Sequence, residues 1–232
     1  MCGRYLVITE DEIIEMKSIL EELNQRFSDA DAFSDAFPDT FSMRSPDARA
    51  AEVVPSLATP VLVEQGGQCR LKPMKWGFSI RGGSGSIINA RAESVEEKPV
   101  FREPFLQHRC IIPSRGFFEW KKPSSAPLLD LATSMDPGPA PGKYWIRRAD
   151  SPLFFMAGIY REDPVLEEFV ILTMPASLPI AAIHDRMPVF LEKPQLLPWL
   201  QDYRVLRMLV QNQAAPVPFL YSQAGIGERK PS

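Results

Sequence analysis

The chain has 232 residues, of which 45% are hydrophobic and 24% are charged, and its formal net charge is −3 at pH 7. The length suits one large domain or two small ones, and this composition is ordinary for a soluble globular protein. A small negative charge excludes binding to nucleic acid through overall charge, so any DNA binding must depend on a local basic patch. No signal-peptide pattern opens the chain and no apolar run approaches a membrane span, so we expect a cytoplasmic protein that is not secreted.

The first predicted elements are a strand over residues 4–8 and an amphipathic helix from Thr9 to Phe27. Thr9 followed by Glu12 is a capping-box pattern. Apolar residues recur on one helix face, which we interpret as core: Ile13, Met16, Leu20, Leu23 and Phe27. Residues 28–50 turn to Asp, Ala, Ser, Phe and Pro without a clear period, which predicts a long surface loop.

Short runs of β-branched and aromatic residues follow, and they predict the strands of antiparallel or mixed sheets. The expected strands are Glu52–Val54, Pro60–Val63, Cys69–Met74, Ile87–Asn89, Arg109–Pro113, Gly116–Lys121, Lys143–Arg147, Leu153–Tyr160, Glu168–Thr173 and Met187–Leu191.

Two later segments have helical character. Residues 93–105 are expected to be helical in parts, broken at Pro99 and Pro104, and residues 194–213 to form a helix whose first turn Pro198 limits. Residues 122–142 are interpreted as a mobile hairpin insertion and residues 225–232 as a frayed polar tail. The pattern predicts an α+β fold over residues 1–232, a single domain of antiparallel or mixed sheets flanked by helices.

Cys2 directly follows Met1, and its small side chain would let aminopeptidase remove that methionine. The mature terminus would then carry an α-amine with a pKa of ~7.7–8.0 beside a thiol with a pKa of ~8.5. Such a pair can condense with an aldehyde to an imine that the thiolate closes to a thiazolidine. It can also act as an N-terminal nucleophile that attacks a carbonyl. On this residue alone, an ordinary small side chain at the start of a strand remains the alternative.

Glu119 and His184 are the two candidate proton-transfer residues. Glu119 lies among Phe117, Phe118 and Trp120, and such an apolar wall would raise its pKa, whereas simple strand alternation would leave it facing solvent. His184 follows an apolar stretch and either shuttles protons or is a hydrogen-bonded structural residue.

Polar residues in or beside these blocks are candidates for substrate contacts. Asn89 either holds a substrate or the Cys2 backbone, or it simply ends a strand. Five arginines either form phosphate clamps or lie on solvated faces: Arg4, Arg91, Arg109, Arg115 and Arg186. Three cysteines without CxxC spacing and only two histidines indicate neither a disulfide framework nor a zinc site. We expect no metal and no organic cofactor.

Six blocks in order give the chain a family resemblance. They are residues 1–5 (MCGRY), 74–78 (MKWGF), 89–93 (NARAE), 109–120 (RCIIPSRGFFEW), 157–160 (AGIY) and 183–189 (IHDRMPV). From Cys2 to about Leu200 the chain resembles the SRAP family, the SOS-response-associated peptidases. The resemblance implies a single α+β domain that shields abasic sites in single-stranded DNA through a slowly reversible thiazolidine crosslink.

The resemblance also implies the site residues. The family's Cys, Asn, Glu and His positions match Cys2, Asn89, Glu119 and His184. By the same analogy, DNA contacts are expected from Arg4, Arg91 and Arg186 to backbone phosphates and from Trp76 by stacking or wedging beside the lesion. The implied partner is single-stranded DNA containing abasic sites, with no membrane and a monomeric protein.

Two positions depart from the family pattern. Phe118 replaces the common tyrosine of the Gly-Phe-Tyr-Glu-Trp block, and residues 54–60 replace an Asn-(Val/Ile)-Ala-Pro block, so DNA contacts near that loop are open. Three other activities stay open as well: a cysteine (auto)peptidase, a non-covalent single-stranded DNA binder, and a β-lyase that cleaves the strand.

Overall fold

The computed structural model describes residues 3–8, 10–25, 52–80, 82–123, 139–212 and 218–224. Cys2, Thr9 and Phe27 lie outside the described residues. The same holds for the predicted loop at 28–50, for most of the predicted insertion at 122–142 and for the predicted tail at 225–232. The mixed sheets and flanking helices confirm the predicted α+β class.

A five-stranded antiparallel sheet carries the N-terminal strand next to one of its edge strands. Its order is β15 (Phe219–Gln223), β10 (Gly142–Arg148), β9 (Gly116–Lys121), β1 (Arg4–Leu6) and β2 (Glu52–Val53). Arg4 pairs with Phe118 and Tyr5 with Phe117, so β1 runs beside β9. The sequence did not predict β15, which adds to the outer edge of β10.

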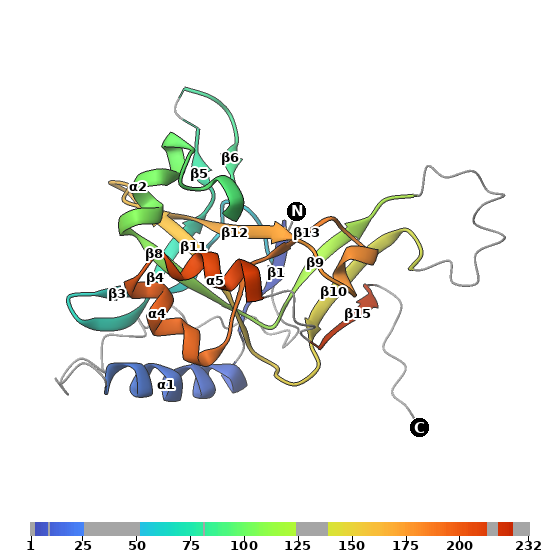
Figure 1. The fold of residues 1–232 in the computed structure, drawn as a ribbon, viewed down its shortest axis with the longest axis horizontal. Helices are drawn as coiled ribbons and strands as arrows, with labels where there is room; N and C mark the ends of the chain where they lie inside the picture. Colours follow the sequence, from blue (N-terminus) through green and yellow to red (C-terminus); the bar gives the residue numbers. More distant parts are fainter. Residues whose placement is uncertain are drawn as a thin grey trace.

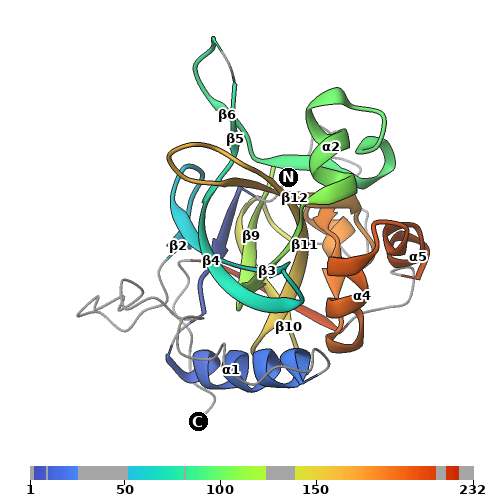
Figure 2. The same cartoon turned by 90° about the vertical axis from the view of Figure 1, so that its left-hand side faces the viewer.

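The second sheet is mixed and closes on itself. Its strands are β3 (Ala58–Gln65), β4 (Gln68–Trp76), β7 (Asn89–Arg91), β8 (Arg109–Ser114), β11 (Phe154–Arg161), β12 (Glu168–Pro175), β13 (Arg186–Pro188) and β14 (Phe190–Leu191). Successive pairings run from β12 through β4, β3, β8 and β11 back to β12, so these five strands form a barrel, which Figure 2 shows end on. Strand β12 pairs in parallel with both β4 and β7, which brings β7 to the edge of the barrel.

The helices lie outside the sheets. Helix α1 (Glu10–Asn24) lies below them, whereas α2 (Pro99–Gln107), α4 (Leu196–Gln201) and α5 (Val205–Asn212) lie on one side (Figure 2). Short 3-10 turns occur at η2 (Ala92–Ser94), η3 (Ile180–Ala182) and η4 (Lys193–Gln195). Among the described residues, no helix is both long and apolar enough to cross a membrane.

Two helix predictions need correction. Pro99 begins α2, where a missing N–H costs nothing, but Pro104 lies inside α2 and does not break it. Phe101 and Phe105 are buried on the same helix, so packing outweighs the lost hydrogen bond. The helix predicted over 194–213 is divided into α4 and α5, because the chain becomes extended at Asp202.

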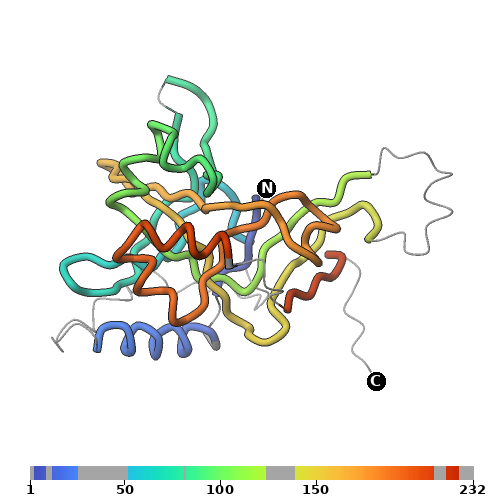
Figure 3. The backbone as a smooth tube through the Cα atoms, in the orientation of Figure 1, coloured from blue at the N-terminus to red at the C-terminus, as the bar shows by residue number. Residues whose placement is uncertain are grey.

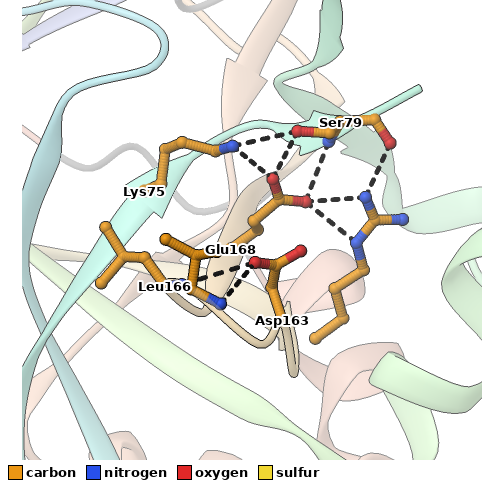
Figure 4. Close-up of polar contacts among 7 residues, drawn as sticks. Lys75, Ser79, Asp163, Leu166 and Glu168 are labelled. Atoms are coloured by element: carbon orange, nitrogen blue, oxygen red, sulfur yellow. Dashed lines mark hydrogen bonds and ion pairs between the residues drawn. The ribbon is translucent and has the colours of Figure 1, made fainter. Parts of the chain in front are cut away.

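A buried carboxylate anchors the hairpin of β5 (Phe78–Ser79) and β6 (Ser86–Ile87), which projects from the top of the molecule (Figure 1 and Figure 3). Glu168 is fully buried, 2.5 Å from Lys75 Nζ and 2.7 Å from Arg161 Nη2. Figure 4 shows its carboxylate facing Lys75 and Ser79. The Ser79 amide and hydroxyl also donate to it, at 2.9 and 2.5 Å. These contacts fix the start of the hairpin, whose second strand leads into Asn89.

Candidate functional site

Glu119 lies near the end of β9 and faces inward, with only 2% of its surface exposed. Strand alternation places it on the same side as the fully buried Phe117 and opposite to Phe118 and Trp120. Burial raises the pKa of the Glu119 carboxyl above its ordinary value, and the nearby His184 opposes this shift only in part. The direction of the predicted pKa shift is therefore confirmed, although Phe118 and Trp120 of the predicted apolar wall lie on the other face of β9.

His184 follows the 3-10 turn η3 and faces Glu119. Its Nε2 lies 3.9 Å from Glu119 Oε2. The Arg186 backbone amide lies 3.0 Å from Nδ1 and donates to it when that nitrogen carries no proton, which leaves Nε2 facing Glu119. Asp185 Oδ1 lies 2.8 Å from the same Nδ1 and accepts a hydrogen bond when that nitrogen carries a proton.

Asn89 is the first residue of β7, at the edge of the barrel. It pairs in parallel with Ile171 of β12, and the preceding carbonyl, that of Ile88, accepts hydrogen bonds from the Ile171 amide at 3.2 Å and the Trp76 indole at 3.0 Å. The backbone around Asn89 is thus held from two sides. Such fixation suits a residue that orients a reacting group.

Trp76 is a core residue, and this corrects its expected role in DNA stacking. The side chain is fully buried, with its ring 5.1 Å from Tyr5 and stacked on Phe169 at 6.4 Å. A ring without exposed surface cannot stack on a base or wedge beside a lesion. Instead, Trp76 joins β1, through Tyr5, to the Ile88 carbonyl that precedes Asn89.

Arg186 and Arg91 lie on either side of β12. Arg186 makes a two-pronged ion pair with Glu93, at 2.5 and 2.9 Å, and donates to the Thr173 carbonyl at 2.6 Å. Arg91 pairs with Thr173 along the strands and is exposed. The side chain of Arg91 is therefore accessible to a phosphate, whereas a phosphate that binds Arg186 must share the guanidinium with Glu93.

Arg109 and Arg115 make contacts with the helices. Arg109 donates to four backbone carbonyls at the ends of α2 and α4: those of Phe105, Leu106, Trp199 and Leu200. Arg115 Nε lies 2.8 Å from the buried Glu12 of α1. Neither contact leaves these guanidinium groups arranged as phosphate clamps.

The described residues bring Glu119 and His184 to the end of β1 that carries Gly3. Arg4 pairs with Phe118, and one further step along these antiparallel strands leads to Gly3 and Glu119. Cys2 lies outside the described residues, but its Cα is joined to that of Gly3 across one peptide bond, about 3.8 Å. Among the described residues, no group of three or more His, Cys, Asp or Glu side chains could hold a metal ion.

Sequence reasoning missed three side chains beside this site. Trp120 was interpreted as part of the wall around Glu119, yet it lies on the opposite face with 41% of its surface exposed. Alternation along residues 116–121 already separates Trp120 from Glu119. Glu52 and Lys143, which form an ion pair on the same outer face, carried no sequence signal because their contact depends on strand pairing.

Comparison with known proteins places the chain in a family. Residues 1–219 match the family model described as SOS response associated peptidase (SRAP). Over 227 residues, 91% of this chain and 87% of the relative, the chain is 32% identical to abasic site processing protein YoqW of Bacillus subtilis (strain 168). It is 31% identical over 211 residues to abasic site processing protein YobE of the same organism, covering 86% of this chain and 82% of the relative.

Solved structures share the fold. A phage-related protein from Bordetella bronchiseptica superimposes with a TM-score of 0.64 at 20% identity, covering 95% of this chain and 93% of that one. A protein from Bacteroides thetaiotaomicron gives a TM-score of 0.54 at 24% identity, covering 73% and 75% of the two chains. The family match, the relatives and the shared fold agree: the chain belongs to the SOS response associated peptidase (SRAP) family.

Proposed function

We propose that the protein processes abasic sites in single-stranded DNA by forming a covalent crosslink through Cys2 after removal of Met1. The relatives named abasic site processing proteins support this activity. The observation that carries the proposal is the buried Glu119, whose pKa is raised and whose carboxyl lies 3.9 Å from His184, beside the strand that Cys2 precedes.

The chemistry balances without a cofactor. The Cys2 α-amine adds to the C1′ aldehyde of the ring-opened sugar and one water leaves, giving an imine. The Cys2 thiolate then adds to the imine carbon and the nitrogen takes up the thiol proton, closing a thiazolidine. The adduct is therefore lighter than the two reactants together by one water.

Glu119 and His184 supply the proton transfers in this proposal. An abasic sugar is mainly a closed hemiacetal, so capture needs an acid for the ring oxygen and a base for the anomeric hydroxyl. A protonated Glu119 delivers the first proton, and His184 relays protons through Nε2. The same Glu119 protonates the thiazolidine in the reverse direction, which gives slow release.

Asn89 and three arginines position the reactants. Asn89 orients the terminal residue, which lowers the entropic cost of attack. Arg4, Arg91 and Arg186 bind backbone phosphates, with Arg186 also tied to Glu93. A peptidase function, which the family description names, is the second candidate.

Denaturing gels of mixtures with an abasic oligonucleotide test the proposal. Wild-type protein should give a denaturant-resistant band, whereas Cys2→Ala should give none. A resistant adduct with Cys2→Ala would contradict the mechanism.

Strand nicking by Cys2→Ser but not by wild type would show that thiazolidine closure suppresses β-elimination. Equal loss of Met1 from wild type and Cys2→Ala would remove support for self-processing.

A further inference from the structure

One carboxylate holds two basic side chains on the outer face of the five-stranded sheet. Glu52 Oε1 lies 2.5 Å from Lys143 Nζ, and Glu52 Oε2 lies 3.0 Å from Arg4 Nη1. These residues come from β2, β10 and β1, which belong to one run of neighbouring strands. The side chains of Lys143 and Glu52 therefore meet across the two strands between them, β9 and β1. We call Arg4, Glu52 and Lys143 the charge bridge.

Aromatic rings lie directly beneath and beside the charge bridge. Lys143 Nζ lies 4.0 Å from the centroid of the Phe118 ring and 5.7 Å from that of Trp120, and Arg4 Cζ lies 5.8 Å from the Trp120 ring. Trp120 is 41% exposed. Basic side chains beside an exposed aromatic ring are the features that surfaces for single-stranded nucleic acid present. This surface adjoins the end of β9 that carries Glu119.

The charge bridge is accessible to solvent and carries a net charge of +1. The side chains of Arg4, Glu52 and Lys143 are 44%, 32% and 25% exposed. Burial alone would raise the pKa of Glu52, but hydrogen bonds from Lys143 and Arg4 outweigh it and lower that pKa. Glu52 is thus ionised at neutral pH. Ion pairs this open to water are weak, so a phosphate can displace the carboxylate.

We propose that Lys143 is a further phosphate contact beside Arg4, and that Glu52 sets specificity by occupying both cations until a DNA strand displaces it. The inference rests on the proposed function, because it takes single-stranded DNA to be the occupant. Covalent capture of a lesion does not require tight reversible binding. By weakening reversible binding, Glu52 therefore lowers the fraction of protein bound to undamaged strands. Strands with an abasic site are still retained, because the crosslink holds them covalently.

Glu52→Gln is the direct test, read by fluorescence anisotropy with an undamaged single-stranded oligonucleotide over a range of salt. Removing the competing charge should allow one more phosphate contact, which steepens the slope of log K against log salt by about 0.7 and tightens binding about fivefold at 0.1 M salt. Lys143→Gln should weaken binding by about the same factor. The double variant restores the net charge of +1 and should return to the wild-type affinity. An unchanged affinity and salt slope for Glu52→Gln would overturn the inference.

Glu15→Gln is the matched control, since it removes the same charge from another ion pair. Glu15 lies on α1, 2.8 Å from Lys193, and Figure 1 shows α1 away from the hairpin of β9 and β10. We expect this variant to bind as wild type does. An equal gain from Glu15→Gln and Glu52→Gln would overturn a local role for Glu52. Thermal unfolding of each variant checks that the sheet stays folded.

Crosslinking measured in parallel separates this inference from the proposed function. A wild-type protein that forms no adduct with abasic DNA contradicts the proposed function, and the anisotropy of Glu52→Gln still decides the inference. Conversely, if wild-type protein forms the adduct and Glu52→Gln binds undamaged DNA as wild type does, the role of Glu52 is overturned and the proposed function stands.

Discussion

The imidazole Nε2 of His184 lies 3.9 Å from the Oε2 atom of Glu119, a carboxyl that β9 holds almost entirely out of solvent. A short relative movement or one bridging water would let a proton pass between them. The backbone amide of Arg186 orients the ring from its other side. This pair is the structural basis of the proposed proton transfers.

Removing the acid should slow capture without preventing it. In Glu119→Gln the side chain keeps its shape but carries no acidic proton, so we expect the crosslinking rate to fall by about 10²-fold, a typical contribution of general acid–base catalysis. Single-turnover gels at pH 7 measure this rate. Reversal should slow as well, because the same proton is needed to open the thiazolidine. A variant with the wild-type rate in both directions would contradict the role of Glu119.

The same substitution should stabilise the protein at neutral pH. Because burial raises the pKa of Glu119, the folded state favours the protonated carboxyl, so its stability contribution is complete below the unfolded pKa and is lost as pH rises through the folded pKa. Glutamine does not ionise, so Glu119→Gln keeps its stability as the pH rises through the folded pKa of Glu119. We expect its unfolding temperature to exceed the wild-type value at pH 8 and the difference to shrink at pH 4. Equal differences at both pH values would contradict this linkage.

Glu168 should have the opposite dependence on pH. Contacts with Lys75, Ser79 and Arg161 outweigh its burial and lower its pKa from 4.5 to about 2. Its contribution is therefore present above about pH 4.5 and is lost as pH falls towards 2. Glu168→Gln should destabilise the fold by about 1.5–3 kcal/mol, because it removes charge-assisted hydrogen bonds from the half-buried Lys75 and Arg161. Denaturant unfolding at pH 7 measures the loss, with the exposed Glu162→Gln as a control that should change little.

Trp76 should act through the core and not through DNA. Trp76→Phe removes the indole N–H and leaves the Ile88 carbonyl without that donor, at a cost of about 1–3 kcal/mol. We expect lower stability and slower crosslinking through displacement of Asn89, with an unchanged salt slope of DNA binding. Weaker DNA binding at unchanged stability would contradict the core role and restore the stacking role.

Local patterns predicted what depends on neighbouring residues. The amphipathic stripe predicted the helix that the structure describes as α1, and the β-branched runs predicted most strands to within a few residues. The direction of the Glu119 pKa shift was predicted as well, although the cause is burial on the inner face of β9 and not contact with Phe118 and Trp120. Each of these follows from the period of a single element.

What the sequence could not supply depends on contacts between distant segments. Strand β15 forms because β10 offers a free edge, and the Glu52–Lys143 pair forms because β2 and β10 join one sheet. The sequence around Trp76 does not show that its ring is buried. The burial depends on the parallel pairing of β4 with β12, two strands far apart in the chain. Pro104 is tolerated inside α2 because of tertiary packing, which no propensity describes.

Intact mass spectrometry can show whether Cys2 forms a covalent adduct with an abasic site. The purified protein is measured before and after incubation with a single-stranded oligonucleotide that carries one abasic site, without added reductant, and with an undamaged oligonucleotide as control. We expect loss of Met1 and a stable adduct whose mass is that of protein plus DNA less one water, absent from the control. A processed protein that forms no adduct, or an adduct equally abundant with undamaged DNA, would contradict it.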